Sequence, residues 1–95
     1  MIEIVWTVSA ENYYLNLLTF VTEQWDIQVA QYLESSVKEN IKRITINPNL
    51  FPQLKHRKPI RKCVVNEHVS FLYQVKENQI IVLLFIDNRS DHIYY

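Results

Sequence analysis

The chain has 95 residues, and ten basic side chains balance ten acidic ones, so its formal net charge is zero. This length allows one domain over residues 1–95 and is too short for two, and a hydrophobic content of 48% excludes a disordered chain. A lone cysteine, Cys63, excludes a disulfide framework and a four-cysteine zinc site. The longest apolar run, Ile80–Ile86, is far shorter than a membrane span, and the N-terminal residues lack the basic flank of a signal peptide. We therefore expect a soluble cytoplasmic protein that does not bind a membrane.

Charge is unevenly distributed along the chain. Residues 1–41 hold six acids and one base, residues 42–66 hold seven bases and no acid, and residues 67–95 hold four acids and two bases. A concentrated basic segment attracts a polyanion or an acidic protein partner even when the whole molecule is neutral. The same composition is typical of an ordinary solvated loop, so charge alone leaves both interpretations open.

The first half of the chain has the pattern of a strand followed by two helices. Residues 2–6 alternate as in a β-strand, and Ser9 is placed to cap a helix whose apolar stripe includes Tyr14 and Leu17. Asp26 is placed to cap a second helix, which keeps apolar residues in steps of three and four until Asn47 precedes a proline. The two helices are therefore expected to form an antiparallel hairpin.

The second half of the chain has the pattern of a loop followed by three strands. Asn47–Pro59 contains all three prolines and no periodicity, and Leu50 and Phe51 within this loop are expected to close the end of the core. In a chain without glycine, Asn66 and Asn78 are the residues expected to take positive φ in the turns. The predicted strands are Ile60–Val65, His68–Lys76 and Gln79–Ile86.

These elements together predict an α+β fold. The last strand is apolar at every position, as expected for a central strand covered on both faces. The order β-α-α-β-β-β therefore predicts an N-terminal strand and a helical hairpin packed on a mostly antiparallel sheet.

The sequence lacks the motifs of several common sites. Without glycine it can form neither a phosphate-binding loop nor a dinucleotide fingerprint. His56, His68 and His92 lie in separate segments without the spacing of metal ligands, and a lone strand cysteine such as Cys63 is typically a small buried hydrophobic side chain. We therefore expect no metal and no cofactor.

Basic and aromatic residues form the most informative constellation. A basic run at Lys55–Lys62 leads into a strand, and Arg89, Tyr94 and Tyr95 follow the last strand. Arginine side chains suit phosphate, and tyrosine rings can stack on unpaired bases. A metal-independent RNA-cutting site needs such groups, because cations must stabilise the charge that builds on phosphorus. A basic patch that serves only a partner protein has the same composition.

The order of elements and three stretches resemble the RelE/ParE superfamily, the toxins of bacterial type II toxin–antitoxin modules. The stretches are Asn47–Pro52, Ile60–Val75 and Phe85–Asp91. RelE-type members are endoribonucleases that cut messenger RNA in the ribosomal A site, and ParE-type members poison DNA gyrase. The resemblance implies that a cognate antitoxin holds both types inactive.

The resemblance also implies roles for individual residues. Arg61 stands about where RelE-type toxins place one strand lysine, and Cys63 occupies the position of a second. Ser70 replaces an arginine that holds the scissile phosphate, while Arg89 matches the arginine after the last strand and Tyr95 the tail tyrosine. The predicted catalytic residues are thus Arg61, Arg89 and Tyr95. The predicted RNA-binding or partner-binding residues are Lys55, Arg57, Lys58, Lys62 and His68.

We therefore expect the toxin component of a type II module, with ribosome-dependent cleavage of messenger RNA as its mechanism. Two alternatives remain open, namely a non-enzymatic ParE-like inhibitor of gyrase and a non-toxic member that only binds its antitoxin. The antitoxin is expected to supply an acidic, partly disordered segment that lies along the basic region and an apolar helix groove.

Overall fold

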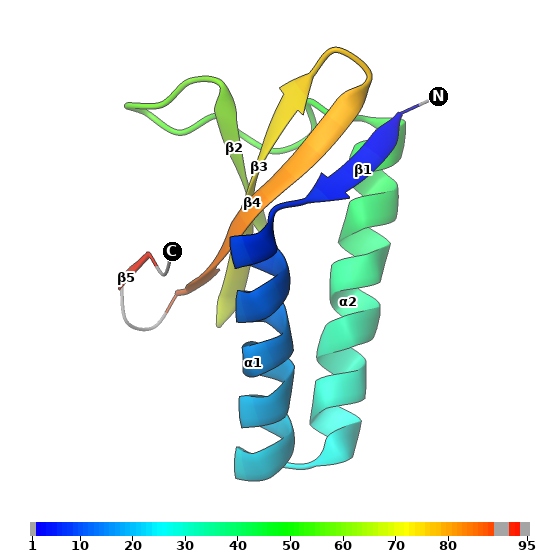
Figure 1. Ribbon diagram of the computed structural model, residues 1–95, viewed down its shortest axis with the longest axis vertical. Helices are drawn as coiled ribbons and strands as arrows, with labels where there is room; N and C mark the ends of the chain where they lie inside the picture. The colour runs from blue at the N-terminus through cyan, green and yellow to red at the C-terminus, as the bar shows by residue number, and fades with distance from the viewer. Residues whose placement is uncertain (1, 89–91, 94–95) are drawn as a thin grey trace.

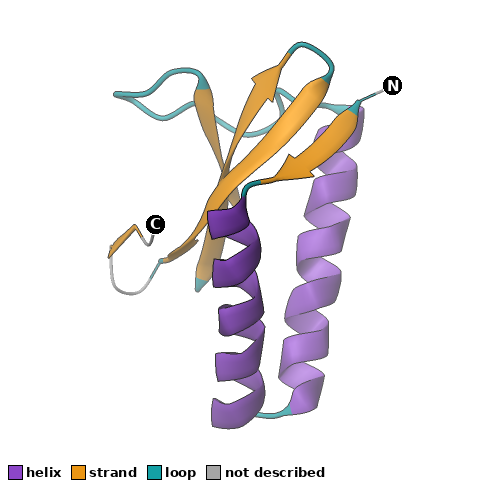
Figure 2. Cartoon of the chain, in the orientation of Figure 1, coloured by secondary structure: helices purple, strands orange, loops and turns teal. Residues whose placement is uncertain are grey.

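Two antiparallel helices pack on one face of a twisted sheet (Figures 1 and 2). A computed structural model of the chain describes residues 2–88 and the backbone of residues 92–93. The helices are α1 (Val8–Gln24) and α2 (Ile27–Ile46). The strands are β1 (Glu3–Trp6), β2 (Ile60–Val64), β3 (Val69–Lys76), β4 (Gln79–Asp87) and β5 (His92–Ile93).

The sheet is mixed, with strand order β1-β4-β3-β2 and the short β5 paired with β4. The first strand runs parallel to β4, and the remaining pairs are antiparallel. The α+β architecture predicted from the sequence is therefore confirmed, as is the central place of the apolar strand β4. The two-residue strand β5 was not predicted.

Both helices begin at side-chain caps, and one of the two predicted caps is wrong. Asp26 caps α2 as predicted, since its carboxylate accepts a hydrogen bond of 2.9 Å from the amide of Val29. The cap of α1 is Thr7 and not Ser9, and the Thr7 hydroxyl accepts from the amide of Ala10 at 3.0 Å. Thr7 also donates to the carbonyl of Leu83 at 2.8 Å, so tertiary pairing with β4 fixes where α1 starts.

Positive φ falls on a glutamate and not on the predicted asparagines. Among the described residues, only Glu77 has positive φ, at 55°. Lys76 pairs with Gln79, so Glu77 and Asn78 form a two-residue hairpin loop. A loop that needs positive φ only at its first position is typical of a type II′ turn, and that position here holds the glutamate.

A bulge in β4 changes which residues face the helices. Leu72 pairs with Leu84 while the adjacent Tyr73 pairs with Val82, so Leu83 is the extra residue. A bulge shifts by one residue the alternation of side chains between the two faces of the sheet. As a result Val82 and Phe85 both lie in the core beneath the helices. The leucines at 83 and 84 both join the smaller apolar cluster. The sheet thus gains a leucine-rich patch on its outer face, away from the helices.

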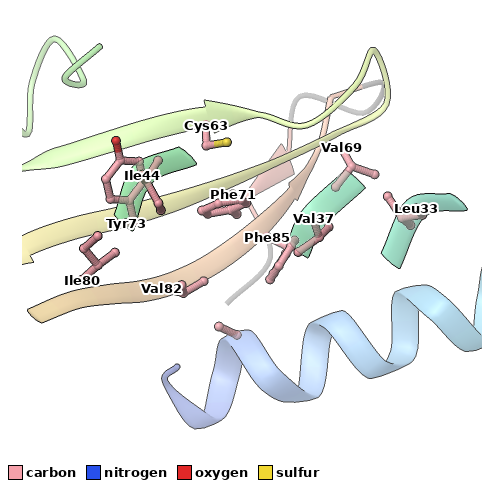
Figure 3. Packing of buried hydrophobic residues seen from close by; sticks show 11 residues of the cluster. Leu33, Val37, Ile44, Cys63, Val69, Phe71, Tyr73, Ile80, Val82 and Phe85 are labelled. Carbon is pink, nitrogen blue, oxygen red and sulfur yellow. The ribbon is translucent and has the colours of Figure 1, made fainter. Parts of the chain in front are cut away.

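The core lies between the sheet and the helices. Figure 3 shows Phe71 and Phe85 from neighbouring strands together with Val37 of α2, and all three side chains are fully or almost fully buried. The ring of Phe85 lies 5.5 Å from that of Phe71. As predicted, Phe51 packs against this core from the loop after α2, but Leu50 is exposed and does not contribute.

Candidate functional site

The loop between α2 and β2 presents the basic residues on a short hairpin-like projection. At its base, Gln53 forms a β-bridge with Arg61, and the amide of Leu54 donates to the carbonyl of Ile60 at 2.8 Å. The projection is therefore anchored while its end stays exposed. We call its four consecutive exposed basic or imidazole side chains the basic tip, which consists of Lys55, His56, Arg57 and Lys58.

A cavity of about 660 Å³ lies beside the basic tip on the outer face of the sheet. Its apolar part is aliphatic, and three side chains of the basic tip, Lys55, His56 and Arg57, also line it. No Phe, Tyr or Trp is among the described lining residues. This outer-face cavity is lined on its apolar side by Leu54, Ile60, Leu72, Leu83 and Leu84.

The structure places Arg61 away from this cavity. Its register partner is Tyr73, a core residue, so Arg61 lies on the helix-facing side of β2. Its Nη1 donates to the carbonyl of Phe51 at 2.7 Å and to that of Asn49 at 3.4 Å. The Tyr73 hydroxyl donates to the carbonyl of Pro48 at 2.8 Å from the same side. Arg61 therefore helps to hold the loop after α2 in place.

The other predicted binding residues are divided between two places. Lys62 pairs with Leu72 and so lies on the outer face, the same face as the cavity beside the basic tip. His68 lies at the β2–β3 turn, where its Nε2 is 3.2 Å from the carboxylate of Glu67. The histidine does not line the outer-face cavity and is not grouped with the basic tip.

Two positions at which the resemblance to RelE-type toxins implies cationic side chains hold buried neutral side chains here, namely Cys63 and Ser70. Cys63 is fully buried, and burial raises the pKa of its thiol to about 12. Ser70 is also fully buried, and its hydroxyl donates to Oδ1 of Asn88 at 2.9 Å. Asn88 in turn donates to the carbonyl of Asn66, so Ser70 belongs to a network that closes the β2–β3 turn against the end of β4.

Two of the predicted catalytic residues, Arg89 and Tyr95, lie outside the described residues. Within residues 2–88, no group of three His, Cys, Asp or Glu side chains is placed to hold a metal ion. No helix in the described part of the chain combines the length and hydropathy needed to cross a membrane.

A second cavity, which the sequence did not reveal, lies near the α1–α2 turn. Its volume is about 340 Å³, and it is lined by six apolar side chains of the two helices, including Phe20 and Tyr32, together with Trp25 of the turn between them. Asn66, His68 and Val69 form the remaining side. We call this the hairpin-tip cavity. Trp25 stands next to the predicted cap Asp26, but the apolar helical stripe alone does not show where the sheet ends or that this ring is exposed.

Comparison with known proteins matches the sequence to a toxin family. The sequence matches a family described as the ParE toxin of the type II toxin–antitoxin system, parDE, over residues 4–93. A search of curated proteins returned no significant match.

Solved structures share the fold at low sequence identity. A chromosomal ParDE toxin–antitoxin structure from P. aeruginosa is 16% identical, with a TM-score of 0.77 over 92% of this chain and 96% of that one. A YoeB/ParE toxin from Agrobacterium tumefaciens is 14% identical, with a TM-score of 0.67 over 90% and 98%. A YoeB dimer from Staphylococcus aureus is 19% identical, with a TM-score of 0.66 over 87% and 92%. At these identities the likeness establishes the fold.

Proposed function

The chain belongs to the ParE toxin family of type II toxin–antitoxin systems, and we propose that it acts on its target by binding and not by cutting RNA. The target that ParE-type members are expected to inhibit is DNA gyrase. Membership in the family also implies an antitoxin partner. In this proposal the sheet supplies binding surfaces and no catalytic centre.

The observation that supports binding over cleavage is the state of three residues on β2 and β3. Cys63 and Ser70 are buried and neutral, and the guanidinium of Arg61 is engaged by carbonyls of the loop after α2. RNA cleavage without a metal needs preorganised cations around the scissile phosphate, and each lost donor of this kind costs roughly two to three orders of magnitude in rate. These three positions, as they are arranged, offer no free cation to a phosphate.

The outer-face cavity fits the antitoxin. Its aliphatic lining can accept apolar anchors, and the basic tip beside it can pair with acidic side chains. Single-stranded nucleic acid is usually held by aromatic rings on which bases stack, and the described lining has no Phe, Tyr or Trp. An acidic amphipathic protein segment therefore matches this cavity better than RNA does.

Induction of the toxin alone in a bacterial host tests this function. We expect growth arrest, loss of supercoiling activity when purified toxin is added to gyrase, and no new message ends by primer extension. Arg89→Ala, which should abolish RNA cleavage by orders of magnitude, should leave the gyrase effect largely intact. Arrest with new in-frame message ends that disappear in this variant would contradict the proposal.

Ribosome-dependent RNA cleavage remains the second candidate because of one feature of the outer face. Lys55, His56 and Arg57 line a cavity of about 660 Å³, with Lys62 on the same face of the sheet. In this mechanism Arg89 and Tyr95 would act on the phosphate and the leaving group. The same induction experiment separates the two functions, and absence of arrest would favour a member that only binds its antitoxin.

A further inference from the structure

Exposed apolar side chains are concentrated around the α1–α2 turn. Of the ten large hydrophobic residues that the described chain exposes, five lie between positions 20 and 32. Single exposed apolar residues are normal, but a contiguous group marks an interaction surface. The five are Phe20, Trp25, Ile27, Val29 and Tyr32.

Four of these five residues, all except Ile27, line a cavity where the helices extend beyond the sheet. Figure 2 shows both helices continuing past the ends of the strands on the side of the α1–α2 turn. Trp25 is 66% exposed and Tyr32 is 71% exposed, and both line the hairpin-tip cavity. Exposed aromatic residues at the edge of a pocket are the usual anchors of protein interfaces.

In the sequence, acidic side chains and no Lys or Arg flank the lining residues of the hairpin-tip cavity. No Lys or Arg is among its lining residues, and residues 1–37 contain neither. Glu23, Asp26 and Glu67 each lie within two positions of a lining residue. Aromatic rings with carboxylates nearby favour a cation, since the faces of Trp, Tyr and Phe attract Lys and Arg. A partner that fits this surface therefore combines apolar anchors with basic side chains.

The same charges disfavour two other occupants. A second copy of the chain bound by the same surface would bring carboxylates against carboxylates. The acidic segment expected of the antitoxin meets the same repulsion here, whereas the outer-face cavity carries the opposite charge. In Figure 1 the loop that bears the basic tip and the α1–α2 turn lie toward opposite ends of the molecule. The two cavities can therefore hold different partners.

We propose that the hairpin-tip cavity binds a basic amphipathic helix of the protein target. This inference rests on the proposed function in one respect, namely that the toxin acts by binding a protein. Apolar residues of the target helix enter between Phe20, Trp25 and Tyr32, and its Lys or Arg side chains lie over the rings and beside the carboxylates.

Two synthetic helices with one leucine face test the chemistry directly. The polar face is lysine in one peptide and glutamate in the other, and binding to the purified chain is followed by anisotropy of a label on the peptide. We expect the lysine peptide to bind at least tenfold more tightly, and Trp25→Lys to weaken it by about tenfold. Ile46→Lys is the matched control, because Ile46 is an 85% exposed apolar residue at the far end of α2. Equal affinity for both peptides, or equal loss in both variants, would overturn the inference.

Gyrase assays test the target itself. We expect Trp25→Lys to need about tenfold more toxin than wild type or Ile46→Lys for half-inhibition of supercoiling, with an unchanged melting temperature and unchanged antitoxin affinity. If wild type and Trp25→Lys inhibit equally, the inference fails while the proposed function stands. If wild type does not inhibit gyrase, the proposed function fails and the assignment of a target to this cavity fails with it. If Trp25→Lys loses antitoxin and keeps inhibition, the cavity belongs to the antitoxin and the inference is overturned.

Discussion

Tyr14 shows how a single polar atom can be left without a partner in the core. Its ring stacks on Phe85 with centroids 5.1 Å apart and packs against Trp6 at 5.3 Å. Its hydroxyl is buried and has no hydrogen-bond partner among the described atoms. A buried hydroxyl without a partner costs about 1–3 kcal/mol of desolvation, so the ring stabilises the fold while the hydroxyl weakens it.

Tyr14→Phe should therefore raise the free energy of unfolding by about 1 kcal/mol, because the ring stays and the unsatisfied hydroxyl is removed. Urea unfolding followed by circular dichroism measures this change. Tyr73→Phe is the matched control, since the Tyr73 hydroxyl donates to the carbonyl of Pro48. The free energy of unfolding of the control should fall by about 1 kcal/mol. A lower free energy of unfolding for Tyr14→Phe would contradict the prediction, because it would show that the Tyr14 hydroxyl has a partner.

Elements in this fold are joined at positions where one side chain serves two purposes. Thr7 caps α1 and also donates to the carbonyl of Leu83 at the β4 bulge. The bulge in turn adds leucine to the outer-face cavity, so the start of a helix and the shape of a binding surface depend on the same pairing. In the β3–β4 hairpin, by contrast, the side chain works against the loop, because the loop needs a positive φ that glutamate disfavours at Glu77.

Glu77→Gly should stabilise the hairpin by about 1 kcal/mol, because glycine takes positive φ without the steric cost that a side chain pays. The measurement is the midpoint of urea unfolding at an unchanged m-value. Glu67→Gly lies in the other turn on β3, and among the described residues positive φ is confined to Glu77, so the control should be neutral or destabilising. Equal effects in both variants would contradict the explanation.

Charge reversal in the basic tip tests whether this loop binds the antitoxin. Reversal of Lys55, Arg57 and Lys58 to glutamate should weaken the complex with the cognate antitoxin by at least tenfold, mainly through repulsion of acidic side chains. Isothermal calorimetry gives the affinity, and the difference should shrink at high salt. The matched control reverses three exposed lysines elsewhere, with the same change in net charge: Lys38, Lys42 and Lys76. If the control weakens binding equally, the antitoxin responds to net charge and does not recognise the tip.

At the scale of the whole molecule, opposite charges are separated by the fold. The chain is formally neutral, but the loop after α2 carries the three bases of the basic tip and no acid, whereas the helical hairpin is free of Lys and Arg up to position 37. The molecule extends 38 Å along its longest axis, and the loop that bears the basic tip and the α1–α2 turn lie toward its opposite ends (Figure 1). In this way a protein with no net charge can present one surface that binds acidic partners and another that binds basic partners.

The core also predicts how stability depends on pH. Burial raises the pKa of Cys63 from 9.0 and that of Tyr14 from 10.0, in both cases to about 12, with Glu34 adding to the shift of Tyr14. The unfolded chain therefore loses these protons at lower pH than the folded chain does, so stability is complete below pH 9 and falls as pH rises toward 12. Urea unfolding between pH 8 and 11.5 should show this fall, and Cys63→Ala should make it shallower. A free energy of unfolding that stays constant over this pH range would contradict the raised pKa values of Cys63 and Tyr14.

The sequence by itself determined the two helices, the four longer strands and their order, because caps, apolar periodicity and proline act within a few residues of one another. Local signals sufficed to place individual elements: the start of α2 follows Asp26, its end lies at Asn47, and β4 contains the apolar run from Ile80. The superfamily resemblance followed from the same local stretches, and the match over residues 4–93 confirms it. The basic segment was visible for the same reason.

Only the tertiary structure decided which residues share a surface. Register places Arg61 beneath the helices and its neighbour Lys62 on the outer face, and the turn at β3 takes His68 away from the basic tip. The bulge at Leu83 and the helix start at Thr7 likewise depend on pairing between strands far apart in sequence. Pairing partners are chosen by the energy of the whole packed sheet, so a local pattern cannot specify them.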